Sequence, residues 1–294
     1  MSFAITAVLP WVLLGASLVL TPRLERALAP RFFTVGIPCM TAAVVVATAT
    51  SVAAVAAVGL RAHSVPAHIL GAALLALAAW RLGVMVRHAW RVWMSYRSAQ
   101  TFARATASGT DVLVVDDPVP DAFASPVGPG VVVITTGMCD VLRSDEVSAL
   151  IGHERAHLRY RHAIWIQLGE LSAQLNPITA GTARAVRHAA ERHADEVAAA
   201  DNRTALLRAI ARASLATADT HRSANSSDLH SGGGDVARRI RALTNPSPTT
   251  TPKRAIVVVS SIAIAALMVS AALGDVVEDC AAPEKGEPPT AVFR

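Results

Sequence analysis

Residues 34–60 read TVGIPCMTAAVVVATATSVAAVAAVGL, a run of 27 residues that contains no Asp, Glu, Lys or Arg. A helix of about 20 consecutive apolar residues crosses the hydrocarbon core of a bilayer, so this run predicts a membrane span that is long enough to tilt. Three more apolar runs, at residues 3–20, 66–86 and 255–274, approach the same length. The sequence therefore predicts a mainly α membrane protein with four transmembrane helices.

The composition of the 294-residue chain agrees with a membrane protein. Hydrophobic residues make up 52% and charged residues 17%, and the mean hydropathy is +0.41, whereas soluble domains carry about 25% charged residues. The first 100 residues contain a single acidic residue, Glu25. Although the pI is near 9.7, the arginines of this region stand at the ends of apolar runs. We therefore expect contact with the lipid bilayer and no direct nucleic-acid binding.

The arginines also predict an orientation in the membrane. Three lie between the first two apolar runs, one lies in the short segment between the second and third, and four closely follow the third run. Basic residues mark cytoplasmic loops. We therefore expect a multi-pass protein of the cell membrane, a bacterial plasma membrane, with its soluble domain in the cytoplasm and both termini outside it.

This topology divides the chain into four parts. They are three transmembrane helices (residues 1–98), a cytoplasmic α+β domain inserted between spans three and four (99–246), a linker with the fourth span (247–274), and a short extracytoplasmic tail (275–294).

The cytoplasmic domain has its own pattern of elements. Residues 111–115 and 130–135 are rich in β-branched residues and are bounded by turn residues, which predicts two short strands. Ser144 is the predicted N-cap of the helix that follows, and Asp145 and Glu146 in its first turn complement the helix dipole.

That helix carries the sequence His153-Glu154-Arg155-Ala156-His157, an HExxH motif. Residues four apart lie on one face of a helix, so the two imidazoles can converge on one tetrahedral zinc ion while Glu154 reaches a water molecule beside it. The alternative is a solvated helix with two incidental histidines. Apolar residues on both sides of the motif and the preceding strand disfavour that alternative.

A catalytic zinc ion needs a third protein ligand and an open coordination position. On the helix predicted at about residues 180–200, Glu191 and Asp195 lie four residues apart on one face. Glu191 is the candidate ligand, and Asp195 could hydrogen-bond the outer nitrogen of His153 and fix its tautomer. The spacing alone is equally consistent with a solvated face on which these carboxylates pair with Arg187.

Other histidines are weaker candidates. His188 shares the face of Glu191 and is a rival ligand, whereas His193 points away from that face. His162 is expected at the end of the HExxH helix and outside the site. His230 lies in a Ser- and Gly-rich stretch, residues 223–234, and is either a linker residue or a residue that stabilises the oxyanion of the transition state.

The order of these features resembles the membrane-embedded gluzincin metallopeptidases, specifically the BlaR/MecR type and its relatives of the HtpX type. The resemblance covers about half of the chain. It rests on VVVITTG (131–137), SDEVSALIGHERAH (144–157), Asn176-Pro177, the segment from Glu191 to Glu196, and Arg239-Ile240 with Leu243. It implies a gluzincin-like fold for the cytoplasmic domain, one catalytic zinc ion, and Glu191 as the third ligand.

The order of the spans favours the BlaR/MecR type. The resemblance implies three spans before the zinc domain and one after it for that type, against two and two for the HtpX type. The apolar run between the motifs, residues 163–175, is too short and too polar to cross a bilayer, and we expect a core helix packed behind the zinc helix. The chain departs from the BlaR/MecR type in one respect. About twenty residues follow Gly274, which are too few to form the penicillin-binding sensor domain of that type.

The resemblance implies a zinc endopeptidase in signal transduction that cleaves a winged-helix repressor of the BlaI/MecI kind. Glu154 would take a proton from water and pass it to the leaving amine. The strand residues Val131, Val132, Val133 and Ile134 would pair with the extended substrate backbone. Two alternatives stay open, an HtpX-like quality-control protease of membrane proteins and a non-catalytic transducer stabilised by zinc. The sequence does not determine the oligomeric state, and a homo-oligomer is one of the states that it allows.

Overall fold

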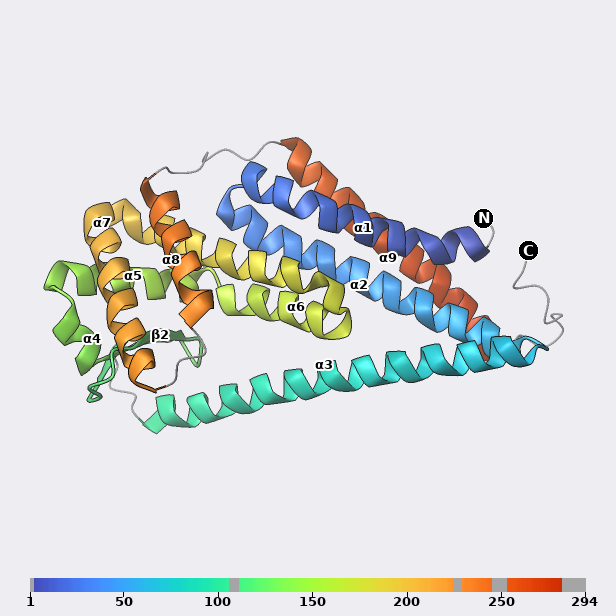
Figure 1. Cartoon of the computed structure of the whole chain (residues 1–294), viewed down its shortest axis with the longest axis horizontal. Coiled ribbons are helices and arrows are strands. Elements are labelled where there is room, and N and C mark those ends of the chain that lie inside the picture. Colours follow the sequence, from blue (N-terminus) through green and yellow to red (C-terminus); the bar gives the residue numbers. More distant parts are fainter. Residues whose placement is uncertain (1–2, 106–110, 225–228, 245–252, 282–294) are drawn as a thin grey trace.

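Figure 1 shows the computed structural model of the chain, which describes residues 3–105, 111–224, 229–244 and 253–281. Helices dominate the described part. Four of them contain a segment that is long and apolar enough to cross a membrane. These are α1 (Phe3–Ala27), α2 (Pro30–Arg61), α3 (Val65–Ala105) and α9 (Lys253–Ala281). The four coincide with the four predicted apolar runs, which suggests a membrane protein.

The helices extend beyond the predicted runs because arginine, a good helix former, does not end a helix where the apolar sequence stops. α1 continues to Ala27 and α2 begins at Pro30, so the predicted loop between the first two spans shrinks to residues 28–29. Pro38 lies inside α2, beyond its first two turns. α9 runs to Ala281, so the start of the predicted tail is helical. The rest of that tail lies outside the described residues.

α3 departs furthest from the predicted span at residues 66–86. Its 41 residues make it about 60 Å long at 1.5 Å per residue, twice the roughly 30 Å of a bilayer core. In Figure 1, α3 runs along the lower edge of the molecule, past α2 and onward to the strands. The second half of α3 therefore borders the α/β part of the chain.

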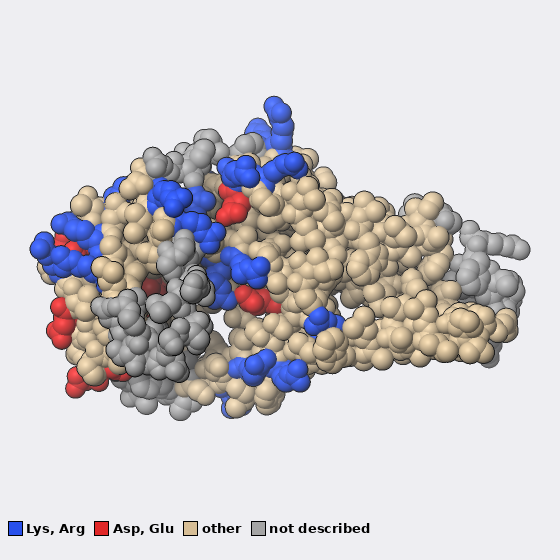
Figure 2. Space-filling model, in the orientation of Figure 1, with Lys and Arg blue, Asp and Glu red and all other residues tan. Residues whose placement is uncertain are grey.

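α1, α2 and α9 lie side by side and form one bundle (Figure 1). Ser51 on α2 donates a 2.6 Å hydrogen bond to the carbonyl oxygen of Ala7 on α1. α3 joins α2 at a close crossing, where a Cβ atom on Gly71 would lie 2.8 Å from the carbonyl oxygen of Ala56. In Figure 2, charged side chains crowd the end that holds α7 and α8, while the far end of the bundle shows almost none on this face.

The sheet has three strands in the order β1-β3-β2. β3 (Val131–Thr135) pairs in parallel with β1 (Val112–Val115) and antiparallel with β2 (Ala122–Ser125). The two predicted strands are confirmed to within one residue, and β2 is an additional strand. Because β3 is central, both of its edges are already paired. The prediction that Val131, Val132, Val133 and Ile134 pair with a substrate is therefore wrong, and Val132, Val133 and Ile134 are buried in the core.

The remaining elements cover and follow the sheet. They are α4 (Thr136–Val141), α5 (Ser144–Arg159), α6 (His162–Leu175), the short 3-10 helix η1 (Pro177–Thr179), α7 (Ala180–Ala224) and α8 (Leu229–Thr244).

Three predicted details of these helices are corrected. The N-cap of α5 is Arg143 and not Ser144, and the Glu146 carboxylate accepts a 3.0 Å hydrogen bond from the Arg143 backbone N–H. α6 packs mainly against α2 and α7 and much less against α5. α7 continues past the predicted end near residue 200 to Ala224, with a kink at Asn202, whose side chain accepts a hydrogen bond from the N–H of Ala205 and caps the second half of the helix.

A buried cluster connects the bundle to α7. Phe33, Ile37 and Met40 of α2 pack in it with Val186 and Ala189 of α7. Each is at most 3% exposed. The segment of α7 that follows is thereby fixed against the bundle, and it carries Glu191.

Candidate metal centre

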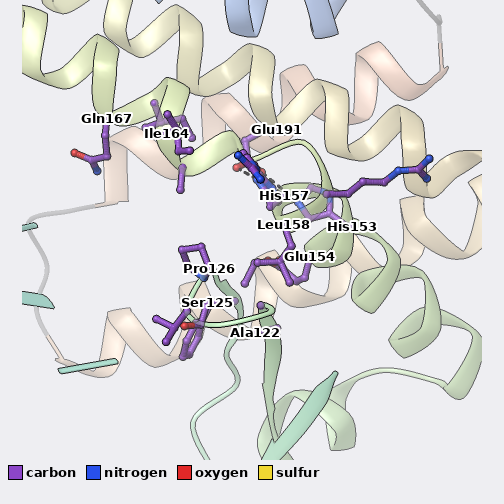
Figure 3. A pocket seen from close by; sticks show the side chains of 18 of the residues that line it. Ala122, Ser125, Pro126, His153, Glu154, His157, Leu158, Ile164, Gln167 and Glu191 are labelled. Carbon is purple, nitrogen blue, oxygen red and sulfur yellow. Dashed lines mark hydrogen bonds and ion pairs between the residues drawn. The ribbon is translucent and has the colours of Figure 1, made fainter. Parts of the chain in front are cut away.

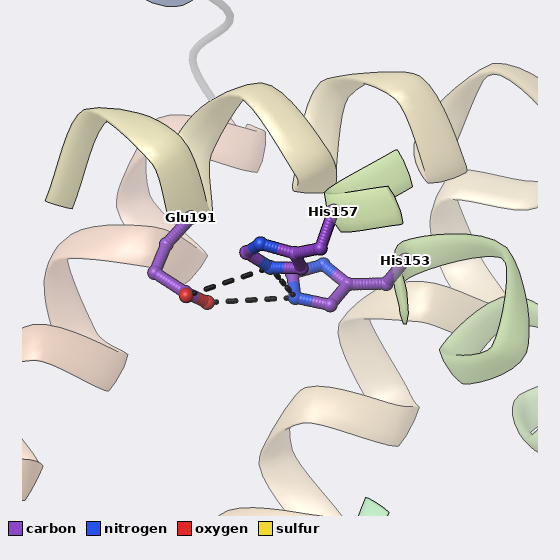
Figure 4. Close-up of side chains that lie close together, drawn as sticks. All are labelled: His153, His157 and Glu191. Atoms are coloured by element: carbon purple, nitrogen blue, oxygen red, sulfur yellow. Dashed lines mark hydrogen bonds and ion pairs between the residues drawn. The ribbon is translucent and has the colours of Figure 1, made fainter. Parts of the chain in front are cut away.

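Three side chains converge from α5 and α7, as Figure 4 shows for His153, His157 and Glu191. The Nε2 atoms of the two histidines are 3.1 Å apart, and the Glu191 carboxylate oxygens lie 3.4 Å from His153 Nε2 and 3.5 Å from His157 Nε2. Ligands at about 2.0–2.1 Å from a tetrahedral zinc ion are about 3.4 Å from one another. The structure thus brings together the three residues nominated from the sequence, and they could hold one metal ion.

Small residues allow the two helices that carry these side chains to approach closely. On α5, Ala156 is 2% exposed, and a Cβ atom on Gly152 would stand 3.9 Å from the Cβ of Ala198 on α7. Ala194, on the turn of α7 after Glu191, is fully buried. The ligand set therefore sits on a tightly packed helix pair and not on loops.

The outer nitrogen of His153 contacts a buried carboxylate, as the sequence predicted. Its Nδ1 atom lies 2.9 Å from Asp195 Oδ1, and both side chains are less than 5% exposed. Arg239 of α8 donates two hydrogen bonds to Asp195, of 2.8 Å from Nε and 2.7 Å from Nη2. The Nη1 atom of Arg239 also lies 3.2 Å from Glu191. One guanidinium thus pairs with two carboxylates at the centre.

These contacts set the protonation of the histidines. Burial would lower the pKa of His153, but its hydrogen bonds to Asp195 and Glu191 outweigh burial and raise that pKa to about 9. Burial lowers the pKa of His157 to about 4. Before a metal ion binds, His153 would therefore carry a proton at neutral pH, and His157 would be neutral.

The two carboxylates of the centre are ionised. Burial opposes the charge of Glu191, but the hydrogen bond from His153 and the positive charge of Arg239 hold its pKa well below the usual range. Burial likewise opposes the charge of Asp195, and the hydrogen bonds from Arg239 and His153 lower its pKa. Ionised carboxylate and neutral imidazole are the forms that bind a divalent metal ion.

Glu154 lies beside the ligands and faces the cavity in Figure 3. Burial raises its pKa to about 7, although the charge of His153 and a hydrogen bond with the backbone of Ala124 on β2 act in the opposite direction. A carboxyl group with a pKa near neutrality can both accept and release a proton at that pH.

The outer nitrogen of His157 meets a second imidazole, which the sequence did not predict. Its Nδ1 atom lies 3.1 Å from Nδ1 of His162, and His162 Nε2 lies 3.0 Å from Nδ1 of His193. The prediction that His162 ends the HExxH helix, outside the site, is wrong, because α5 ends at Arg159 and His162 starts α6. Burial lowers the pKa of His162 to about 3, so its ring is neutral.

The centre opens into a cavity of about 1500 Å³. Figure 3 shows Ser125 and Pro126 on one side of it, Ile164 and Gln167 of α6 on the other, and the ligands between them. Trp93, in the second half of α3, adds a further apolar wall. The cavity therefore lies between the α/β part and a helix that continues into a candidate membrane span.

The remaining histidines fall outside the ligand set. His188 is buried on α7 but is not in the group that could hold the metal ion, and His193 contacts His162 instead. His230 lies within α8, so the predicted loop is helical from Leu229 onward, and the side chain of His230 lies outside the described residues.

The sequence does not indicate two features of the site. It identifies Arg239 only through the resemblance and not as a partner of Asp195. It also does not show that β2 is the strand next to Glu154. Both belong to segments remote in sequence from the HExxH motif, so no local spacing could have indicated these contacts.

Comparisons with known proteins place this region among metallopeptidases. A family model described as Peptidase family M48 matches residues 87–221. The HtpX protease homologue of Thermodesulfovibrio yellowstonii is 42% identical over 52 residues, which are 17% of this chain and 18% of the relative. The homologue of Thermoplasma acidophilum is 40% identical over 53 residues, 17% of each chain.

The chain thus matches less than a fifth of the length of these curated relatives. No solved structure matches the chain. The family match and the relatives support a membrane metallopeptidase.

Proposed function

We propose that the chain is a membrane-bound, zinc-dependent endopeptidase with one catalytic zinc ion. The observation that supports this most directly is the set of His153, His157 and Glu191, spaced as ligands of one ion at the wall of a large cavity that Glu154 also lines. Two imidazoles and one carboxylate, with a position left open, are a donor set of catalytic zinc sites.

In this proposal each residue has one task. Zinc, when bound there by His153, His157 and Glu191, supplies Lewis-acid chemistry that activates water and polarises the scissile carbonyl. Glu154 takes the proton of the attacking water and later delivers it to the leaving amine. Asp195 holds His153 in the tautomer that leaves Nε2 free.

The substrate backbone would pair with β2 in place of the strand expected from the sequence. β2 lies at an edge of the described sheet, and the backbone of Ala124 already hydrogen-bonds to Glu154. An extended peptide added along this edge would therefore place its carbonyl groups beside Glu154. Recognition through the main chain favours endopeptidase activity over hydrolysis of small esters.

The arginine pattern supports a cell-membrane protein with its metal centre on the cytoplasmic side and both termini on the other side. A cytoplasmic regulatory protein is then one candidate substrate, and the resemblance to BlaR/MecR-type proteins suggests a winged-helix repressor in signal transduction. A membrane-protein substrate is the second candidate. The cavity wall formed by Trp93 of α3 favours the latter, because it extends an apolar surface from a candidate span to the centre.

The test uses the full chain purified in detergent, with unfolded casein as a general substrate. We expect cleavage that stops on chelation and returns with zinc. Glu154→Gln should retain zinc but slow cleavage by about 10²–10⁴-fold, the usual contribution of a general base. Glu170→Gln is the matched control, since Glu170 pairs with Arg187 and lies outside the ligand set.

Cleavage by Glu154→Gln at the wild-type rate would exclude Glu154 as the general base. A wild-type chain that binds zinc but cleaves nothing would leave the alternative of a non-catalytic transducer in which zinc only stabilises the fold. Assays with a winged-helix repressor of the BlaI/MecI kind, and with a misfolded membrane protein, separate the two candidate substrates.

A further inference from the structure

We infer that His162 and His193 are positioning residues that hold His157 in the one tautomer able to bind the metal ion. The inference rests on the proposed metal centre and goes beyond it, because it assigns a role to two histidines outside the ligand set. Its basis is a chain of three imidazoles from α5, α6 and α7.

The position of His157 defines which nitrogen is the ligand. Its Nε2 atom faces the other two candidate ligands, at 3.1 Å from His153 and 3.5 Å from Glu191. A neutral imidazole carries one proton, and the nitrogen that binds the metal ion must be free of it. The proton therefore belongs on Nδ1, where the neighbouring atom at 3.1 Å is Nδ1 of His162.

This assignment fixes the protons of the whole chain. If His157 Nδ1 donates, then His162 Nδ1 accepts, and the proton of His162 lies on its Nε2 atom. That N–H points to Nδ1 of His193 at 3.0 Å, which accepts in turn. Each contact then holds one proton, and the reversed arrangement would put a proton on the metal-binding nitrogen of His157.

The fold holds His162 in place for this contact. Its ring is 1% exposed and meets the His157 ring edge-on, with centroids 4.8 Å apart. Arg161, the residue before it, has φ +52°, a left-handed conformation that is uncommon outside glycine. That residue turns the chain sharply from α5 into α6, so His162 comes back onto His157 only five positions later.

The far end of the chain is also packed. The ring of Tyr160 lies 4.4 Å from the His193 ring and 6.0 Å from the His162 ring, measured between centroids. His193 is on α7, two residues after Glu191. The imidazole chain therefore connects the helix that supplies two ligands to the helix that supplies the third.

The test measures zinc affinity by competition with a chelator, using the full-length chain in detergent. All variants carry Glu154→Gln, so the result does not depend on peptidase activity. His162→Phe keeps the ring volume but removes the acceptor, and we expect zinc affinity to fall by about 10–100-fold, as for other outer partners of metal ligands. His162→Asn places an amide oxygen near the position of Nδ1 and should restore part of that affinity.

Two further measurements separate positioning from packing. His88→Phe is the matched control, because His88 contacts Gln167 of α6 and no ligand. It should leave zinc affinity unchanged. The visible absorption spectrum of bound Co²⁺ should change in His162→Phe, because the orientation of one ligand ring changes, and should not change in the control.

Wild-type zinc affinity in His162→Phe would overturn the inference, as would equal losses in His162→Phe and His162→Asn with both chains folded. Failure of the positioning role can be distinguished from failure of the proposed function. If His162→Phe weakens zinc binding but the chain with Glu154 intact cleaves nothing, the positioning role holds and the endopeptidase proposal fails. If the parent chain binds neither zinc nor Co²⁺, both are wrong.

Discussion

The two histidines of the HExxH motif sit one helical turn apart, but their outer nitrogens meet opposite environments. His153 contacts the ionised Asp195, which Arg239 holds with two hydrogen bonds. His157 contacts the neutral imidazole of His162. The hydrogen bonds to Asp195 and Glu191 raise the pKa of His153 to about 9, whereas burial lowers the pKa of His157 to about 4.

The difference shows that the motif fixes the ligand positions while the surrounding helices decide how each ligand behaves. The charged partner increases the basicity of His153 and strengthens its bond to a cation. The neutral partner fixes the ring of His157 without adding charge to a centre that already contains two carboxylates. We call His153 with Asp195 the charged arm of the centre and His157 with His162 the neutral arm. We therefore expect the two arms to respond differently to mutation and to pH.

The largest effect should follow removal of a ligand. His153→Ala or His157→Ala leaves two protein ligands, and we expect the purified chain to lose its zinc almost completely in elemental analysis. The two variants should be alike in this respect, because both imidazoles belong to the ligand set whatever their outer partners are. Full zinc retention by either variant would remove that histidine from the centre.

Asp195→Asn should have the next largest effect, and a larger one than His162→Asn. The asparagine oxygen can still accept from His153, but the charge is lost and Arg239 keeps only Glu191 as its acidic partner in the centre. We expect zinc affinity to fall by up to about 100-fold, measured by chelator competition. A smaller loss than in His162→Asn would contradict the view that the charged arm contributes more.

The pH dependence of zinc binding distinguishes the charged arm from the neutral arm, and the measurement leaves all three ligands in place. Below its pKa of about 9, His153 must release a proton to bind zinc, whereas His157 is already neutral above its pKa of about 4. In a Glu154→Gln chain, zinc affinity should therefore rise about tenfold per pH unit between about pH 6 and pH 8. Asp195→Asn should flatten this slope, because His153 loses the partner that raises its pKa. A slope near two would mean that both histidines bind protons.

The smallest effect is expected at His193, one hydrogen bond further from the metal centre. His193→Ala leaves the contact between His162 and His157 in place. Zinc affinity should fall by less than about tenfold, the lower end for outer partners. A loss as large as that of His162→Phe would mean that the two residues act as one unit.

The candidate ligands could be predicted from the sequence because their spacing is a property of helices. His153 and His157 are four residues apart, and so are Glu191 and Asp195, so each pair lies on one face whatever the tertiary structure. The contact of Asp195 with His153 followed from the same periodicity. Resemblance to known metallopeptidases was needed to choose Glu191 over a solvated face.

Other features depend on contacts that no local pattern encodes. A continuous run of β-branched residues indicates that β3 is a strand, but not that it is central, because the order of strands is set by pairing between remote segments. The helix break at Arg161 lacks a glycine or proline, so the sequence places His162 at the end of the HExxH helix instead of at the start of α6. α3 continues past its apolar run because its later residues, including Trp93, still favour a helix.

The central claim is that His153, His157 and Glu191 together hold one catalytic zinc ion. X-ray absorption at the zinc edge of the purified full-length chain tests it most directly. We expect one zinc ion per chain with two imidazole nitrogens and otherwise oxygen ligands, and no more than a trace of zinc-edge signal in His157→Ala. Sulfur among the ligands, or a spectrum unchanged by His157→Ala, would contradict the claim.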